Sequence, residues 1–164
     1  DPVTVPQGTV APGHHKNLYT AIHRRVQLRS AVATGRAEDV AGQALGMGTG
    51  GHALVRQVQL LCEDEPWVYA RTVIPRTTLT GRERRLAYLK SKSLGATLFA
   101  DPSMRRSEVE VVRATARDRL HGIVATQLDI VPAVIWGRRS VFTLHDKPLL
   151  VSELFLPVIE EKGF

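Results

Sequence analysis

The sequence predicts an α+β protein with a single antiparallel β-sheet and inserted flanking helices. Three observations support this class. Apolar and polar residues alternate in several segments of the 164-residue chain, which is the period of a strand with one buried face. Short turns join neighbouring segments into hairpins, and the helical segments do not alternate one by one with the strands. We therefore expect an antiparallel sheet and not a doubly wound parallel one.

The first half of the chain is expected to supply three strands and two helices. Residues 1–13 hold three prolines and two glycines, so an extended or disordered lead-in is expected ahead of one domain, residues 14–164. The strands are expected at 25–33, 53–60 and 66–74, and the helices at 38–45 and 81–93. The acidic turn 63–65 predicts a hairpin between the second and third strands.

The second half is expected to return to strands, at 108–114, 134–144 and 149–156, with a hairpin turn at 145–148. The helical pattern of 81–93 predicts which of its side chains are buried. Leu86 and Leu89 are expected to point inward. The charged residues expected in solvent are Arg82, Glu83, Arg84 and Lys90.

Two opposite charges occupy positions where strand alternation predicts a buried face. Arg56 shares its face with Leu54 and Val58, and Glu153 shares its face with Leu149 and Val151. An isolated buried ion costs more free energy than its neighbours gain by packing. Each charge therefore needs a partner, which is the other charge, a third residue or a ligand. A buried polar pocket is the first functional hypothesis.

Composition limits the class of function. The net charge is +6 and the pI is about 10.0, but the cations are spread in short groups and aromatic residues make up 5% of the chain. Stacking platforms for nucleic acid are therefore not expected, and a basic field that attracts a small anionic substrate explains the charge. No apolar run is long enough for a membrane span, so a cytoplasmic protein is expected, as a monomer. The single cysteine, Cys62, allows no intrachain disulfide and no zinc cluster.

Three motifs do not support the kinds of site that their residues first suggest. Residues 46–51 match the letters G-x-G-x-x-G, but a helix-like segment precedes them and a strand follows, the reverse of a dinucleotide site. They are expected to form a flexible loop beside the site. The pair His14 and His15 lacks further ligands at metal spacing, so no metal is expected. Ser140 and Ser152 lack the context of a hydrolase nucleophile.

Five segments in order resemble the chorismate pyruvate-lyase family, over roughly Val26 to Pro157. That family converts chorismate to 4-hydroxybenzoate and pyruvate, a first step toward ubiquinone. The segments that carry the resemblance are Ala53–Cys62, Glu65–Pro75, Ser93–Phe99, Trp136–Ser140 and Lys147–Pro157.

The resemblance implies a lyase that needs no cofactor and that buries its ligand under two flaps. By position, Arg56 matches the family's carboxylate-binding arginine and Glu153 the glutamate that meets the ring hydroxyl. Leu94 matches a flap residue whose backbone contacts the ligand. His15 aligns with the other flap residue, which is usually apolar in the family, and Arg71 is the candidate for the enolpyruvyl carboxylate.

The resemblance leaves two questions open. Glu153 either acts as a base or only holds the hydroxyl while hydrogen transfer is intramolecular. The fold also resembles the ligand-sensing UTRA domains of bacterial transcription regulators, so a binding module without catalysis is the alternative. Such sensors normally follow a DNA-binding helical domain, for which residues 1–25 leave no room.

Overall fold

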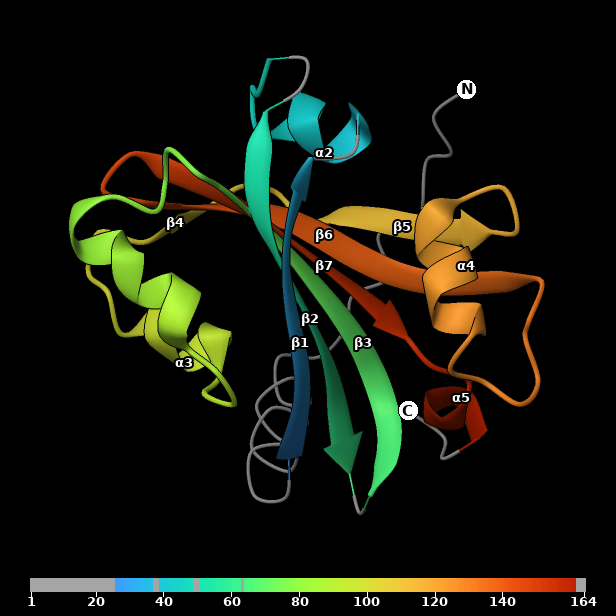
Figure 1. Cartoon of the computed structure of the whole chain (residues 1–164). Coiled ribbons are helices and arrows are strands. Elements are labelled where there is room, and N and C mark those ends of the chain that lie inside the picture. The colour runs from blue at the N-terminus through green and yellow to red at the C-terminus, as the bar shows by residue number, and fades with distance from the viewer. Residues whose placement is uncertain (1–25, 37–38, 49–50, 63, 162–164) are drawn as a thin grey trace, which may run out of the picture.

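A seven-stranded antiparallel sheet organises the chain (Figure 1). The computed structural model describes residues 26–36, 39–48, 51–62 and 64–161. The strand order is β1-β2-β3-β7-β6-β4, and β5 also pairs with β6. The strands are β1 (Val26–Arg36), β2 (His52–Cys62), β3 (Glu65–Pro75), β4 (Arg105–Arg106), β5 (Glu110–Thr115), β6 (Val134–Leu144) and β7 (Lys147–Phe155). The helices are α2 (Asp39–Ala44), the 3-10 helix η1 (Gly81–Tyr88), α3 (Leu94–Phe99), α4 (Arg119–Ala125) and α5 (Val158–Glu161).

This architecture confirms the predicted fold class and the six predicted strands. The β2–β3 and β6–β7 hairpins lie where the turn residues predict them. In the second hairpin, His145 and Asp146 both have positive φ angles, the conformation that matches a two-residue turn to the twist of its strands. The sequence did not predict β4, α4, α5 or a separate helix α3. The lead-in, residues 1–13, lies outside the described residues, so that boundary stays a prediction.

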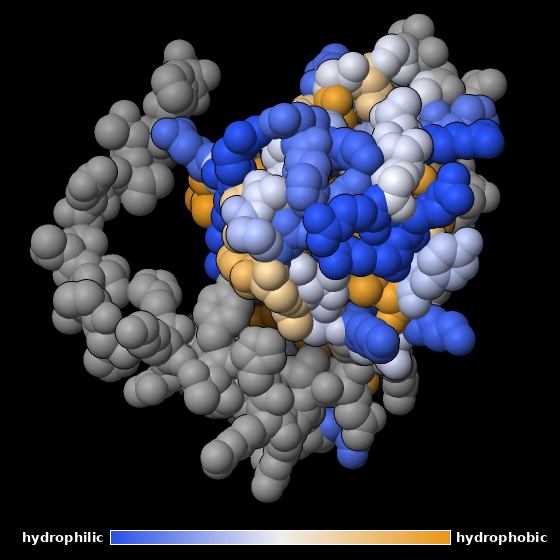
Figure 2. All heavy atoms as spheres, turned by 90° about the vertical axis from the view of Figure 1, so that its left-hand side faces the viewer, coloured by the Kyte–Doolittle hydropathy of each residue, from blue (hydrophilic) through white to orange (hydrophobic). Residues whose placement is uncertain are grey.

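Helices cover both faces of the sheet (Figure 1). On one face, η1 and α3 pack over the largest apolar cluster, which includes Ile74, Leu86, Leu98 and Leu144. The other face carries two separate clusters, one under α2 and one under α4 and α5. The side of the molecule that carries η1 and α3 is largely hydrophilic on its outer surface (Figure 2). The apolar stripe of these helices therefore faces the sheet, as amphipathic patterning requires.

The prediction that Glu83 lies in solvent is wrong. Its side chain is 2% exposed, whereas Arg82 and Arg84 are exposed as predicted. The reason is the helix type, because residues three apart are aligned in a 3-10 helix and Glu83 therefore shares the buried face of Leu86 and Leu89.

Two side chains at the β6–β7 turn, Lys147 and His145, contact the buried Glu83 carboxylate. Lys147 Nζ donates to it at 2.7 Å and His145 Nδ1 lies 2.9 Å away. The hydrogen bond from Lys147 is the main reason that the pKa of Glu83 lies below its ordinary value, with the His145 bond adding to it. Lys147 also donates to the carbonyl of Thr80 at 2.9 Å. This cluster fastens η1 to the end of the β6–β7 hairpin.

Candidate functional site

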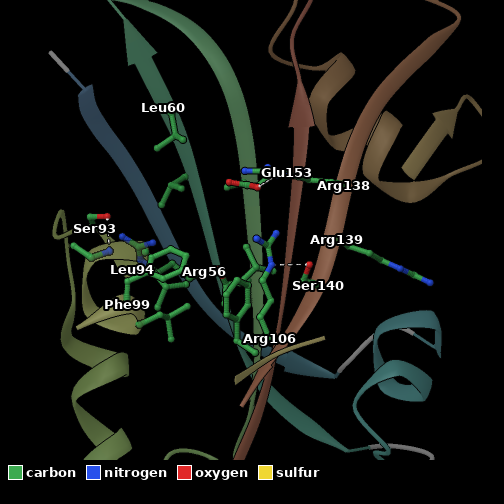
Figure 3. Close-up of a pocket in the computed structure, with 18 of the residues that line it drawn as sticks. Arg56, Leu60, Ser93, Leu94, Phe99, Arg106, Arg138, Arg139, Ser140 and Glu153 are labelled. Atoms are coloured by element: carbon green, nitrogen blue, oxygen red, sulfur yellow. Dashed lines mark hydrogen bonds and ion pairs between the residues drawn. The ribbon is translucent and has the colours of Figure 1, made fainter. Parts of the chain in front are cut away.

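A cavity of about 550 Å³ lies between the sheet and α3 (Figure 3). Its floor comes from one face of β2, β3, β7, β6 and β4, and one wall comes from α3 and the turn that precedes it. Most of the lining is apolar. The charged residues that line it are Arg56, Arg106, Arg138, Arg139 and Glu153.

Strand register brings the residues of the floor together. Partners across an antiparallel ladder point to the same face of the sheet. Two rows of such partners therefore run across the cavity floor, and each begins on β2 and ends on β6. The first row is Arg56, Thr72, Val151 and Ser140, and the second is Val58, Ala70, Glu153 and Arg138. The two charges that the sequence singled out thus lie on one face, in adjacent rows.

Arg56 is a buried guanidinium with an unsatisfied donor. The residue is 3% exposed, and its Nη2 donates to the carbonyls of Lys90 at 3.1 Å and Lys92 at 2.9 Å. These bonds tie the turn between η1 and α3 to the sheet. Its Nε is also buried, and no described residue accepts a hydrogen bond from it. Burial lowers the pKa of Arg56, because it removes water from the charged group. A buried charged donor without an acceptor among the described residues suits an anionic ligand.

Glu153 pairs with Arg138 and not with Arg56. Arg138 Nε donates to Glu153 Oε2 at 2.5 Å, and the two residues are direct partners in the β6–β7 ladder. The Arg138 guanidinium also lies 5.9 Å from the ring centre of Phe155. Close approach of the strands depends on Gly137, where a Cβ atom would lie 2.2 Å from the carbonyl oxygen of Glu153. The bond from Arg138 therefore holds the Glu153 side chain at the cavity, and the close approach of the strands at Gly137 positions the Glu153 backbone.

Leu94 lies at the first position of α3 and lines the cavity. Its side chain is 7% exposed and packs into the apolar cluster beneath α3. The preceding residue, Ser93, caps the helix by accepting a hydrogen bond from the backbone N–H of Ala96 at 3.2 Å. This cap and the Arg56 bonds fix the segment that closes one side of the cavity.

The structure does not bring Arg71 to the cavity. A regular hairpin that continued from the Cys62–Glu65 pair would place Arg71 opposite Arg56, on the same face. A register shift between Leu60 and Leu61 moves the pairing by one residue, so Arg56 faces Thr72 instead. A shift of one residue sends every later side chain to the other face. Arg71 is buried on the face that carries α2, α4 and α5.

Two further predicted positions do not contribute to the described cavity. His15 lies outside the described residues. Of the glycine-rich loop, the described residues 46–48 and 51 do not line the cavity, so the prediction of a loop beside the site is wrong for them. The loop instead connects α2 to β2, at the end of the sheet covered by α2.

Sequence reasoning missed Arg106, which lines the cavity from β4. Its partner in the ladder is Phe142, and its guanidinium carbon lies 5.2 Å from the centre of that ring. Its Nε donates to Ser140 Oγ at 3.1 Å. The strand expected at 108–114 begins too late to include it, and a two-residue strand gives no period that could have revealed its face. Arg139 also borders the cavity, but the end of its side chain points away from it (Figure 3) and pairs with Glu110 at 2.6 Å.

Two further features, a metal-binding group and a membrane-spanning helix, are not found among the described residues. These residues contain no group of three or more His, Cys, Asp or Glu side chains that could hold a metal ion. None of the described helices has the length and hydropathy to cross a membrane.

The fold is that of ligand-binding domains of bacterial regulators. It matches the ligand-binding domain of a GntR-family transcriptional regulator from Bordetella bronchiseptica, with a TM-score of 0.55 and 17% identity over 81% of this chain and 83% of that one. The C-terminal domain of the histidine utilization repressor from Pseudomonas syringae gives a TM-score of 0.59 and 13% identity over 82% and 93%. Identities this low establish the fold alone.

Sequence comparison identifies the family. Residues 17–163 match the family model described as chorismate lyase, and the chain therefore belongs to that family. It is 46% identical over 104 residues to the "Probable chorismate pyruvate-lyase" of Psychromonas ingrahamii, which covers 63% of this chain and 56% of that protein. The protein of the same name from Nitrosospira multiformis is 42% identical over 109 residues, or 66% of this chain and 61% of that protein. The matched part thus spans less than two thirds of these relatives.

Proposed function

We propose that the protein is a chorismate pyruvate-lyase that forms 4-hydroxybenzoate, the ring precursor of ubiquinone, and pyruvate. The family supports the reaction class, and the cavity supports the substrate. Chorismate is a ring of six carbons with a carboxylate, a hydroxyl and an enolpyruvyl ether that carries a second carboxylate. A mostly apolar cavity with a few fixed polar groups suits such a ligand.

The reaction needs no external electron acceptor. The ether bond between the ring and the enolpyruvyl oxygen breaks, and that oxygen becomes the keto oxygen of pyruvate. The hydrogen on the ring carbon that bears the hydroxyl moves to the enolpyruvyl methylene carbon, which becomes the methyl group. The electron pair of the broken C–H bond forms the third double bond of the ring. Aromatisation supplies the driving force, so the protein acts by positioning and electrostatics.

The buried donor of Arg56 is the observation that carries this proposal. The ring carboxylate would accept from Arg56, whose guanidinium is already oriented by two carbonyls. The hydroxyl at the far end of the ring would donate to Glu153, which Arg138 holds in place. Leu94 and the segment around it would exclude water from the ring. The roles match a ligand whose polar groups lie at opposite ends of an apolar ring.

The direct test is to incubate the purified protein with chorismate and to follow 4-hydroxybenzoate by absorbance and pyruvate by a coupled dehydrogenase assay. The proposal expects both products in equal amounts. If chorismate binds without product formation, the chain is a sensor of the kind that its fold neighbours represent. If chorismate neither binds nor reacts, the proposal is wrong. The same material on a sizing column tests the expected monomer.

Glu153→Gln separates positioning from base catalysis. Glutamine still accepts a hydrogen bond from the substrate hydroxyl, so we expect kcat to fall about tenfold or less. A general base would contribute about 10²- to 10⁴-fold, so a loss in that range would assign the proton transfer to Glu153. Glu110→Gln is the matched control, because Glu110 also pairs with a β6 arginine but lies outside the cavity lining. Steady-state kinetics of both variants and the parent protein make the comparison.

A further inference from the structure

We infer that Arg106 binds the enolpyruvyl carboxylate of the substrate, the position for which the sequence suggested Arg71. The inference deepens the proposed function and rests on it. It assigns the second of the two anionic groups of the substrate to the second of the two cavity arginines that have no carboxylate partner among the described residues.

Charge pairing in the cavity singles out Arg106. Arg138 is paired with Glu153, and Arg139 is paired with Glu110 outside the lining. The remaining two, Arg56 and Arg106, have no carboxylate partner among the described residues. Arg56 is buried, whereas Arg106 lines the cavity as an exposed residue. A ligand with two carboxylates would pair with both guanidinium groups. Chorismate brings two carboxylates, and its ring product keeps one.

Arg106 is oriented for this contact. Its Nε is fixed by Ser140 Oγ, and the face of its guanidinium rests on Phe142. The two terminal nitrogens have no partner among the described residues. In Figure 3 the side chain runs up the centre of the cavity, with its guanidinium beside Ser140 and below the Glu153–Arg138 pair. The terminal donors therefore stand in the cavity, already oriented for an oxyanion.

The two cations occupy different sides of the cavity. Arg56 comes from β2, beside Leu94, and Arg106 comes from β4, with β3, β7 and β6 between them. We propose that a ligand with carboxylates on two arms contacts both. A contact to the enolpyruvyl arm would also restrain it over the ring, where its methylene carbon must meet the migrating hydrogen. After reaction that carboxylate leaves with pyruvate, so Arg106 contributes to the binding of chorismate and not to that of 4-hydroxybenzoate.

The test compares Arg106→Gln with Arg105→Gln. The control residue is its neighbour in β4, lies outside the cavity lining and forms an exposed ion pair with Asp146. For Arg106→Gln we expect the KM for chorismate to rise about tenfold to a hundredfold, the loss typical of a charge-assisted hydrogen bond. Its Kd for 4-hydroxybenzoate should stay within about twofold of the parent value. Arg105→Gln should change neither constant.

Two results would overturn the assignment. A parent-like KM in Arg106→Gln would show that the arginine does not meet the substrate. An equal rise in chorismate KM and 4-hydroxybenzoate Kd would show a general structural or electrostatic role. Should the parent protein bind chorismate without turnover, the proposed lyase activity fails, and the same comparison is then made with the Kd for chorismate from calorimetry. If the parent does not bind chorismate at all, both the inference and the proposed function fail.

Discussion

Arg56→Ala is expected to reduce kcat/KM for chorismate by more than about 10³-fold. The substitution removes the buried donor proposed to hold the ring carboxylate, and charged hydrogen bonds in desolvated sites carry the largest binding energies. It also leaves the carbonyls of Lys90 and Lys92 without the donor that fixes the turn before α3. Binding of 4-hydroxybenzoate should be lost together with turnover, because the product retains the ring carboxylate. Kinetics and titration calorimetry measure the two effects.

Arg56→Lys separates loss of the site from loss of the fold. Lysine keeps the charge but cannot reproduce a planar set of donors shared between two carbonyls and a carboxylate. We expect a folded protein, judged by circular dichroism and melting temperature, that still loses about 10²-fold in kcat/KM. Arg84→Ala, an exposed arginine on η1, serves as the control and should behave like the parent. Parent-like turnover by either Arg56 variant would refute the site assignment.

Glu83→Gln is expected to lower the free energy of unfolding by about 2 kcal/mol, the cost typical of a buried charged hydrogen bond left without its partner. The Glu83 side chain is 2% exposed, and its two carboxylate oxygens contact Lys147 and His145. Glutamine offers one neutral carbonyl oxygen in their place. The contact fastens η1, one of the two elements that cover the cavity face, to the β6–β7 turn. Urea denaturation at neutral pH measures the loss. Glu160→Gln, an exposed glutamate in α5, is the control and should have little effect.

The loss of stability in Glu83→Gln should become smaller as the pH falls. The pKa of Glu83 is lowered in the folded protein, mainly by Lys147, from an ordinary value of 4.5. The folded state therefore binds fewer protons than the unfolded state in that range, and the stability from Glu83 is full above pH 4.5. It fades as the pH falls through the lowered pKa. The difference between the parent and Glu83→Gln should accordingly shrink in acid, and a difference that stays constant from pH 7 to about pH 3 would contradict this account.

Alternation within single strands made Arg56 and Glu153 visible in the sequence. Each lies on a stretch where every second residue is apolar, so the period alone marks it as a charge on a buried face. That reasoning needs no knowledge of neighbouring strands. It also explains why the fold class and the two hairpins could be predicted, since both depend on contacts that are local in the sequence.

The alternation of apolar residues, in contrast, does not reveal strand register or helix type. Because of the register shift between Leu60 and Leu61, Arg71 faces away from Arg56. No residue in that stretch indicates the shift in the sequence. Arg106 is placed by a two-residue strand that pairs with residues far along the chain. The prediction for Glu83 is wrong because an α-helix and a 3-10 helix would both bury Leu86 and Leu89, but only the 3-10 repeat places Glu83 on the same face. These features are set by tertiary packing.

The pairing of β3 with β7 has a consequence for how the protein folds. This ladder joins the β2–β3 hairpin to the β6–β7 hairpin, and its partners, such as Val68 and Phe155, are separated by more than half of the chain. Contacts between distant segments form slowly, because a large loop must close before they stabilise anything. Each hairpin can form early on its own, one with Arg56 and the other with Glu153. The two ends of the proposed ligand site therefore meet only at the slow step, and binding of the ligand would report its completion.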